Sequence, residues 1–353
     1  MTARTWLVTG GAGFIGANFV RSSLGRCCER LVNLDLLTYA ACPQTRAALD
    51  RLPGYTLARG DIADRALLDA LFARHRPQTV FHFAAESHVD RSIDRPADFI
   101  ATNVLGTAVL LDAVLAYWRA LPAAERRAFR YVQISTDEVF GSIAAGRFTE
   151  DSPLRPNSPY AASKAAADHL ARAWHRTYGL PAIVTHCSNN YGPFQFPEKL
   201  IPLMILKGLA GETLPLYGDG RQVRDWLHVD DHVQALWTAA ERAAPGAVYL
   251  IGGDSERTNR QVVETICDRL DERRPPASGR PRRESIISVE DRPGHDRRYA
   301  IDASRLRREL GWAPTVDFAA GLAATVDWYL EHPEWVAAAR DSYRGERLGM
   351  AVA

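Results

Sequence analysis

A glycine-rich turn near the start of the chain constrains the fold more than any other segment. An apolar run at residues 5–9 leads directly into Gly10-Gly11-Ala12-Gly13-Phe14-Ile15-Gly16, and an amphipathic pattern follows. Glycines at these positions allow a tight strand-to-helix turn and let a pyrophosphate approach the N–H groups that open the helix. The segment therefore predicts the first strand-turn-helix unit of a dinucleotide-binding fold.

An acidic residue closes the second predicted strand. Asp35 follows the last glycine by roughly 20 residues, the spacing at which a carboxylate accepts hydrogen bonds from an adenosine ribose in this fold. The same charge repels a 2′-phosphate, and the next residues are Leu36 and Leu37 rather than arginine. The pattern therefore favours NAD over NADP as the cofactor.

Short apolar runs alternate with amphipathic stretches through the first half of the chain. This alternation is typical of repeated strand-helix units around a parallel sheet. We expect strands at residues 5–9, 31–35, 55–59, 79–83, 131–135 and 182–187, and helices at residues 14–24, 65–74, 98–118 and 160–178. The predicted fold class is α/β, a Rossmann-type doubly wound parallel sheet with a smaller C-terminal substrate-binding lobe.

The pattern changes beyond Asn189, where segments punctuated by proline and glycine replace the regular alternation. Helical patterns return at residues 229–243 and 259–270, with a strand-like run at residues 248–251 between them. We therefore expect an NAD-binding domain at residues 1–188, with returning segments near 225–255. A mainly substrate-binding domain at residues 189–353 interleaves with it.

Charge and cysteine content exclude several other classes of protein. The 353 residues carry a net charge of +1, with both signs interspersed, which argues against nucleic acid or an anionic membrane as a partner. The five cysteines show no C-x-x-C spacing, which argues against a disulfide framework or a metal site and fits a reducing cytoplasm. We find no signal-peptide pattern and no run of about 18 apolar residues, so we expect no membrane span.

A tyrosine and a lysine stand four positions apart in the helix expected at residues 160–178. Tyr160 and Lys164 therefore share one face of that helix, where the ammonium can lower the pKa of the phenol from its usual value near 10. Such a phenol serves as a base near neutral pH. Beside a nicotinamide, the dyad explains removal of hydride from an alcohol.

Two further acids, Asp137 and Glu138, follow Ser135 and Thr136 at the end of an apolar run. Oxidation of an alcohol does not use either of these carboxyl groups. Neighbouring carboxyls can hold different protonation states, because proximity and burial raise one pKa relative to the other. The pair therefore indicates a second step, an elimination that needs one acid and one base.

Taken together, these motifs resemble the dTDP-glucose 4,6-dehydratases of the extended short-chain dehydrogenase/reductase superfamily. The resemblance runs from about Thr5 to Trp328, and it rests on residues 9–16, 135–138, 160–164, 189–193 and 291–296. The acid pair separates this family from related epimerases and decarboxylases, which lack it. The resemblance implies tightly held NAD⁺, dTDP-glucose as the substrate and a homodimer through the helices near 98–118 and 160–178.

The resemblance also implies a role for each group. Tyr160 would take the proton of the sugar 4-hydroxyl while hydride leaves C4, and Thr136 would orient the 4-oxygen. Glu138 would then remove the C5 proton while Asp137 protonates the departing 6-hydroxyl. Return of hydride to C6 would give the 4-keto-6-deoxy sugar nucleotide and regenerate the cofactor.

Three sets of site residues follow. The predicted catalytic residues are Thr136, Asp137, Glu138, Tyr160 and Lys164. The residues predicted at the cofactor are Gly10, Gly13, Phe14, Ile15, Gly16, Asp35, Thr38, Asp61, Ile62, Phe83, Ala84, Ala85, Thr102, Tyr160, Lys164, Cys187 and Asn190. The residues predicted at the sugar nucleotide are Ser87, His88, Thr136, Asn189, Asn190, Glu198, Lys199, Leu200, Pro215, Tyr217, Arg224, Asn259, Arg292 and His295.

Arg224 is expected to clamp the diphosphate, because a guanidinium binds phosphate oxygens in a bidentate way, and Tyr217 is expected to stack on the base. Two other residues each have two possible interpretations. His88 either approaches a phosphate or is a hydrogen-bonded structural histidine. Asp61 either reads the adenine edge or caps a helix.

A few positions depart from the family pattern, and other functions remain open. Leu36 stands where the family often has lysine, and Phe140 and Phe194 replace usual tyrosines, changes that the chemistry should survive. The alternatives are a UDP-sugar 4,6-dehydratase, a sugar-nucleotide 4-epimerase, which needs no acid pair, and a non-catalytic NAD-binding sensor. Thymidine and uridine differ by one methyl group, and the sequence does not decide between them.

Overall fold

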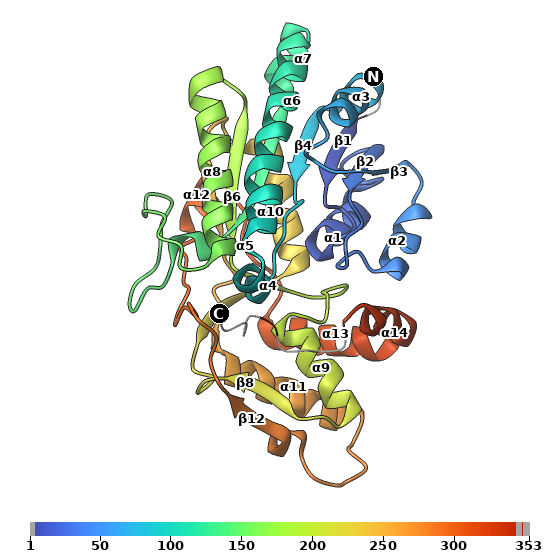
Figure 1. The fold of residues 1–353 in the computed structure, drawn as a ribbon, viewed down its shortest axis with the longest axis vertical. Helices are drawn as coiled ribbons and strands as arrows, with labels where there is room; N and C mark the ends of the chain where they lie inside the picture. Colours follow the sequence, from blue (N-terminus) through green and yellow to red (C-terminus); the bar gives the residue numbers. More distant parts are fainter. Residues whose placement is uncertain (1–3, 344–347, 349–353) are drawn as a thin grey trace.

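A parallel sheet of seven strands forms the centre of the molecule in the computed structural model, which describes residues 4–343 and 348 (Figure 1). The strand order is β10-β6-β5-β4-β1-β2-β3. The strands are β1 (Thr5–Thr9), β2 (Arg30–Asp35), β3 (Tyr55–Arg59), β4 (Thr79–His82), β5 (Arg130–Thr136), β6 (Ala182–Cys187) and β10 (Val248–Ile251). The order reverses between β1 and β4, so the predicted doubly wound Rossmann topology is confirmed.

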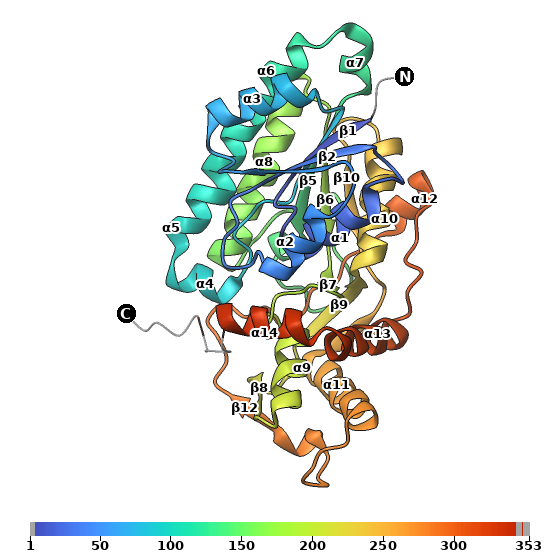
Figure 2. The same ribbon diagram turned by 90° about the vertical axis from the view of Figure 1, so that its right-hand side faces the viewer.

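Helices cover both faces of this sheet, as Figure 2 shows. One layer contains α3 (Arg65–His75), α6 (Thr107–Ala120) and α8 (Pro159–Tyr178), and the other contains α1 (Phe14–Ser23), α10 (Val229–Arg242) and α12 (Ser304–Leu310). Leu7 of β1 packs into the first layer, whereas Trp6 and Val8 pack into the second. Successive strand side chains point to opposite faces, so a strand covered on both sides is apolar throughout.

The helix that carries the predicted dyad has well-defined ends. Ser158 caps α8 by accepting a hydrogen bond from the Ala161 N–H at 3.1 Å, and Pro159 follows at the first helical position. The helix ends at Gly179, which adopts the left-handed conformation with φ at 74°. Tyr160 therefore lies in the first turn, at the carboxyl edge of the sheet.

The helix expected at residues 98–118 is a longer run of three parts. α5 (Pro96–Phe99) continues into a π-helical segment, η1 (Ile100–Gly106), and then into α6. This run, Pro96–Ala120, is long and apolar enough to cross a membrane by length and composition, although polar residues interrupt it. Half of its most apolar window is buried, and α6 packs against α3 and α8, which is the behaviour of a core helix.

The chain beyond Cys187 builds a smaller lobe at the carboxyl edge of the sheet. Its strands are β7 (Asn189–Tyr191), β8 (Leu214–Tyr217), β9 (Val223–His228), β11 (Glu256–Thr258) and β12 (Ile286–Val289), and its helices are α9 (Leu200–Ala210), α11 (Asn259–Arg273), α13 (Phe318–Glu331) and α14 (Pro333–Ser342). The lobe has its own apolar core, in which Ile205, Ile266 and Leu322 are fully buried. From the same half of the chain, β10 returns to the large sheet beside β6.

Short elements complete the described chain. They are α2 (Pro43–Asp50), α4 (Val89–Asp94), α7 (Ala123–Ala128), the 3₁₀ turn η2 (Asp137–Phe140) and the 3₁₀ turn η3 (Arg282–Ser285). The five cysteines are free. The division into domains 1–188 and 189–353 stays a prediction.

Candidate active site

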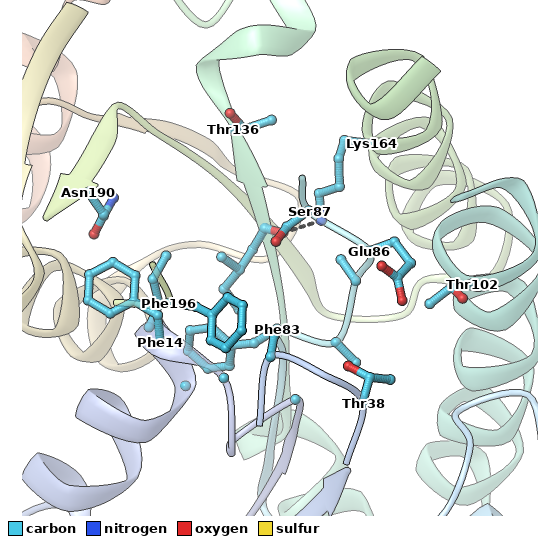
Figure 3. Close-up of a pocket in the computed structure, with 18 of the residues that line it drawn as sticks. Phe14, Thr38, Phe83, Glu86, Ser87, Thr102, Thr136, Lys164, Asn190 and Phe196 are labelled. Carbon is cyan, nitrogen blue, oxygen red and sulfur yellow. Dashed lines mark hydrogen bonds between the residues drawn. The ribbon is translucent and has the colours of Figure 1, made fainter. Parts of the chain in front are cut away.

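A cavity of about 320 Å³ lies at the carboxyl edge of the sheet. Its walls come from the turns that follow the strands β1 to β5, from Thr102 of η1, from the start of α8, and from residues 187–199. Ligands of open α/β sheets bind at this edge. Figure 3 shows Thr136 and Lys164 toward one end of the cavity and Thr38 and Phe83 toward the other.

The cavity brings together every residue predicted as catalytic and every residue predicted at the cofactor. Of the residues predicted at the substrate, those that line it are Ser87, Thr136, Asn189, Asn190, Glu198 and Lys199, and those that do not are His88, Leu200, Pro215, Tyr217, Arg224, Asn259, Arg292 and His295. Further residues that the motifs did not indicate also line the cavity, namely Leu34, Leu36, Ala40, Ala41, Gly60, Glu86, Ile134, Ser135, Ser188, Gln195 and Phe196. Most of these are chain neighbours of predicted residues, but Gln195 and Phe196 carry no motif signal.

The glycine turn leaves room for a bound group. Gly10 has φ at 73°, and a Cβ at Gly16 would lie 2.3 Å from the Gly10 carbonyl oxygen, so both positions require glycine. A Cβ at Gly13 would meet only that oxygen, at 3.5 Å, so the side of Gly13 is open. Gly13 also starts α1 without a capping side chain. The N–H groups that open the helix thus remain available to an anion, and the turn fits a dinucleotide pyrophosphate.

Asp35 supports the glycine turn and lines the cavity at once. Its carboxylate accepts hydrogen bonds from the backbone N–H groups of Ala12 and Leu37, both at 2.8 Å. Burial raises the pKa of Asp35, and these two hydrogen bonds lower it. The acceptor expected for an adenosine ribose is therefore held in a fixed orientation at the end of β2.

Asp61 follows β3 and also lines the cavity. It accepts a hydrogen bond from the Ala63 N–H at 2.9 Å. The residue that caps α3 is Asp64, which accepts from Leu67 N–H at 3.0 Å. The helix-cap interpretation of Asp61 is therefore wrong, and the predicted adenine contact stays a prediction.

The acid pair sits in the tight turn that follows β5. Thr136 accepts a hydrogen bond from the Glu138 N–H at 3.3 Å, which starts the turn η2. Asp137 is only 1% exposed, and its Oδ2 is buried without a hydrogen bond. Burial raises the pKa of Asp137 well above its usual value, and the neighbouring Glu138 and Asp225 raise it further. This environment favours the protonated form of Asp137.

Glu138 has a different electrostatic environment. Burial raises its pKa as well, but three cations, Arg292, Lys199 and Arg224, oppose the rise. Of these three cations, only Arg224 is among the groups that lower the pKa of Asp137, together with a hydrogen bond from Thr136. The two neighbouring carboxyls are thus unequal, with Glu138 the easier to ionise and Asp137 the easier to keep protonated.

Tyr160 and Lys164 line the cavity and are both buried. Burial raises the pKa of Tyr160 well above 10, Glu138 and Cys187 add to the rise, and a hydrogen bond with Thr136 opposes it. The Lys164 Nζ donates to the Ile134 carbonyl oxygen at 2.8 Å. The expectation that the pKa of the phenol is lowered is therefore wrong for the protein without its cofactor, because burial raises it and Lys164 is not among the groups that shift it most.

His88, which does not line the cavity, has a structural role. It caps α4 by accepting from the Arg91 N–H at 3.3 Å, and its Nε2 lies 3.1 Å from the Glu198 carbonyl oxygen. Burial lowers the pKa of His88 to about 4, so the ring is neutral. The structure therefore favours the structural interpretation of His88 over the phosphate contact.

The predicted diphosphate clamp also lies outside the cavity lining. Arg224 donates to the carbonyl oxygens of Val223 and Asp296, at 2.8 and 2.9 Å, and its guanidinium stacks on the Tyr299 ring at 4.1 Å. Arg224 is nevertheless close enough to both acids of the pair to affect their pKa values. Its phosphate contact stays a prediction.

Several of the remaining predicted substrate residues gather next to Arg224. Arg292 forms an ion pair with Asp90, and the Tyr217 hydroxyl donates to Asp90 at 2.9 Å. His295 pairs with Asp291 and packs edge-on against Tyr217. Leu200 and Asn259 begin α9 and α11, and Pro215 lies on β8. Contacts of this group with a sugar nucleotide stay predictions.

The cavity at the carboxyl edge of the sheet and its tyrosine-lysine pair define the class of this protein, which is an extended short-chain dehydrogenase/reductase. The family model for GDP-mannose 4,6 dehydratase matches residues 7–325, and the chain belongs to that family. The resemblance to dTDP-glucose 4,6-dehydratases seen in the motifs is confirmed by individual proteins.

One of these, from Xanthomonas campestris pv. campestris (strain B100), is a dTDP-glucose 4,6-dehydratase that is 57% identical over 99% of both chains. Another, from Neisseria meningitidis serogroup B, is 52% identical over 98% of this chain and 99% of its own. The crystal structure of DesIV, a dTDP-glucose 4,6-dehydratase from Streptomyces venezuelae with NAD bound, superposes with a TM-score of 0.85. It is 46% identical and covers 94% of this chain and 98% of its own.

Proposed function

We propose that the chain is an NAD-dependent dTDP-glucose 4,6-dehydratase, a hydro-lyase that converts dTDP-glucose to dTDP-4-keto-6-deoxyglucose. The observation that carries the proposal is the unequal acid pair, Asp137 and Glu138, in one cavity with Tyr160 and Lys164. Oxidation of an alcohol alone uses neither of these acids, whereas an elimination needs one as a proton donor and the other as a base. Relatives more than 50% identical over almost the whole chain bear the same name.

NAD is held by residues that the structure brings to the cavity. The open face of Gly13 and the start of α1 receive the pyrophosphate, and Asp35 accepts from the adenosine ribose. When bound, NAD⁺ supplies a hydride acceptor for C4, a hydride donor for C6 and a positive charge that favours a nearby phenolate.

Tyr160 acts on the first proton. Its phenolate takes the proton of the sugar 4-hydroxyl, and Lys164 helps to stabilise the negative charge on that oxygen. Thr136 already hydrogen bonds Tyr160, so its hydroxyl lies where it can donate to the 4-oxygen and orient it. The ketone that forms at C4 acidifies the C5 hydrogen.

The acid pair then carries out the elimination. Glu138, whose ionised form is favoured by Arg292, Lys199 and Arg224, removes the proton from C5. Asp137, buried and protonated, gives its proton to the departing 6-hydroxyl, which leaves as water. The proton on Glu138 exchanges with water, and after C6 is reduced Glu138 donates a solvent-derived proton to C5.

The alternatives lack the same support. A 4-epimerase needs Tyr160, Lys164 and NAD but leaves Asp137 and Glu138 without a function. A non-catalytic NAD-binding sensor requires none of these four side chains in the cavity. A UDP-sugar 4,6-dehydratase would use the same chemistry, and the relatives' names favour the thymidine nucleotide.

Mass spectrometry of the products tests this function. With NAD⁺, the protein should convert dTDP-glucose to a product lighter by one water, and the product should carry solvent deuterium at C5 when the reaction runs in heavy water. UDP-glucose, assayed in parallel, should be the poorer substrate by kcat/KM. A product of unchanged mass, or a 4-epimer, contradicts the proposal.

We also propose a cytoplasmic homodimer that binds dTDP-glucose and neither nucleic acid nor membrane. The run Pro96–Ala120 and α8 carry large apolar side chains on the surface, with Ile100, Leu105 and Tyr178 between 42% and 60% exposed. A second copy of the chain packed on these helices would cover them. Light scattering after size-exclusion chromatography measures the dimer, and Leu105→Glu should weaken it.

A further inference from the structure

A carboxyl group that the proposed mechanism does not use lies one helical turn beyond Lys164. Asp168 of α8 is completely buried and does not line the cavity. Residues four apart on a helix share a face, so Tyr160, Lys164 and Asp168 follow one another along the same face of α8. Asp168 therefore stands directly behind the catalytic dyad.

Asp168 connects three elements of the active site. Its Oδ2 accepts a hydrogen bond from the Ser135 hydroxyl at 2.7 Å and lies 3.1 Å from the Nε2 of His186 on β6. One residue earlier on β5, the Ile134 carbonyl oxygen accepts from the Lys164 Nζ. Lys164 and Asp168 thus hold consecutive residues of β5, immediately before Thr136 and the acid pair.

The second carboxylate oxygen of Asp168 lacks a hydrogen bond. Among the described residues, its Oδ1 is a buried side-chain oxygen without any partner. Leaving such an oxygen unpaired is costly unless a nearby cation compensates its charge. The ammonium of Lys164, on the same helix face, is the group that can do so.

Among the other titratable groups around these two side chains, His186 contacts only the Oδ2 of Asp168 and forms an ion pair with it only when its ring is protonated. These titratable groups are Tyr131 on β5, His82 on β4, His186 and Cys187 on β6, Tyr160 on α8, and Asp137 and Glu138 in η2. Burial lowers the pKa of His82 to about 3, so that ring is neutral. The tyrosines, the thiol and the acids carry either no charge or a negative one.

We propose that Asp168 is a positioning residue of the catalytic dyad, which keeps Lys164 charged and fixes the end of β5 against α8. The pKa of Lys164 supports this role, because burial lowers it and Asp168 is the strongest of the groups that raise it. Without the carboxylate, a buried ammonium loses its proton more easily. The inference rests on the proposed function only for its effect on turnover, since the charge of Lys164 is measurable without substrate.

The composition of the chain makes that measurement direct. Lys164, Lys199 and Lys207 are the only lysines, so protein labelled with ¹³C at the lysine ε-carbon gives three lysine signals, and Lys164→Arg assigns one of them. In Asp168→Asn the pKa of Lys164 should fall by about 1–3 units, the size of the effect of one nearby opposite charge. Ser135→Ala, which removes a hydrogen bond and keeps the carboxylate, should leave the pKa of Lys164 within about half a unit of the wild-type value.

Two outcomes overturn the inference. One is a Lys164 pKa that does not change in Asp168→Asn, and the other is an equal fall in Ser135→Ala, which would assign the effect to packing. Circular dichroism verifies that each variant folds, and Asp168→Ser serves as the neutral variant if the asparagine protein does not.

Turnover of dTDP-glucose gives a second readout. The alkaline limb of the kcat profile, where Lys164 loses its proton, should move to lower pH in Asp168→Asn and return toward the wild-type position in Asp168→Glu. An unmoved limb in Asp168→Asn contradicts the inference. Absence of turnover in the wild-type protein contradicts the proposed function instead, and the lysine titration still decides the role of Asp168.

Discussion

Replacement of Glu138 by glutamine isolates the base of the acid pair. Glutamine has the shape of glutamate but does not accept the C5 proton. A positioned proton transfer contributes about 10²–10⁴-fold in rate, which is about 3–5 kcal/mol of barrier. Because burial keeps Asp137 protonated, the neighbouring carboxyl does not take over. We therefore expect turnover to fall by about 10³-fold or more.

The assay separates oxidation from elimination. Glu138→Gln leaves Tyr160, Lys164 and Thr136 intact, so the C4 oxidation should proceed and reduced nicotinamide should accumulate on the enzyme, visible by its absorbance. In heavy water, C5 of the bound sugar should acquire no deuterium. The matched variant Asp137→Asn retains the base, so it should exchange the C5 hydrogen while water loss slows.

The opposite pattern refutes the assignment of the two acids. If Glu138→Gln exchanges C5 at the wild-type rate and Asp137→Asn does not, the base is Asp137. If Glu138→Gln turns over normally, neither the charge asymmetry around the pair nor its proposed use is relevant to catalysis.

Three further predictions concern cofactor and stability. Gly16→Ala places a Cβ 2.3 Å from a backbone oxygen and should lower the free energy of unfolding by about 1–3 kcal/mol in urea, whereas Gly13→Ala should preserve stability and weaken NAD binding. Asp35→Asn removes the charge that repels a 2′-phosphate, so the ratio of the Kd values for NADP and NAD, measured by fluorescence titration, should fall. The pKa of His82 is about 3 in the folded protein, whereas its usual value is 6.5. As the pH falls, the His82 ring therefore takes up a proton in the unfolded chain before it does so in the folded protein. Between those values the wild type should lose about 1.4 kcal/mol more stability per pH unit than His82→Gln; equal pH slopes contradict this.

Local sequence patterns predicted the elements that carry the chemistry. Residues that are close together in the chain determine the strand-turn-helix unit of β1 and α1. They also determine the end of β5, and the structure confirms both elements. Lys164 follows Tyr160 by one helical turn, so their shared helix face was readable from spacing alone. Tyr160 and Lys164 approach the acid pair because α8 packs against β5 and against the turn η2 that follows it.

Features that depend on tertiary structure were not predictable in this way. Burial sets the pKa of Tyr160, and no spacing rule gives the depth at which a side chain lies. Phe196 lines the cavity although the motif at residues 189–193 ends before it, and no sequence pattern marks it as a lining residue. The π-helical segment Ile100–Gly106 interrupts a regular helical pattern without a proline or glycine pair to indicate it.

The proposed reaction requires that the hydride taken from C4 returns to C6 of the same sugar, and dTDP-glucose labelled with deuterium at C4 tests this step. The product should carry this deuterium at C6, and a mixture of labelled and unlabelled substrate should show no exchange between molecules. Loss of the label to solvent, or its retention at C4 in an epimer, would contradict the proposed reaction.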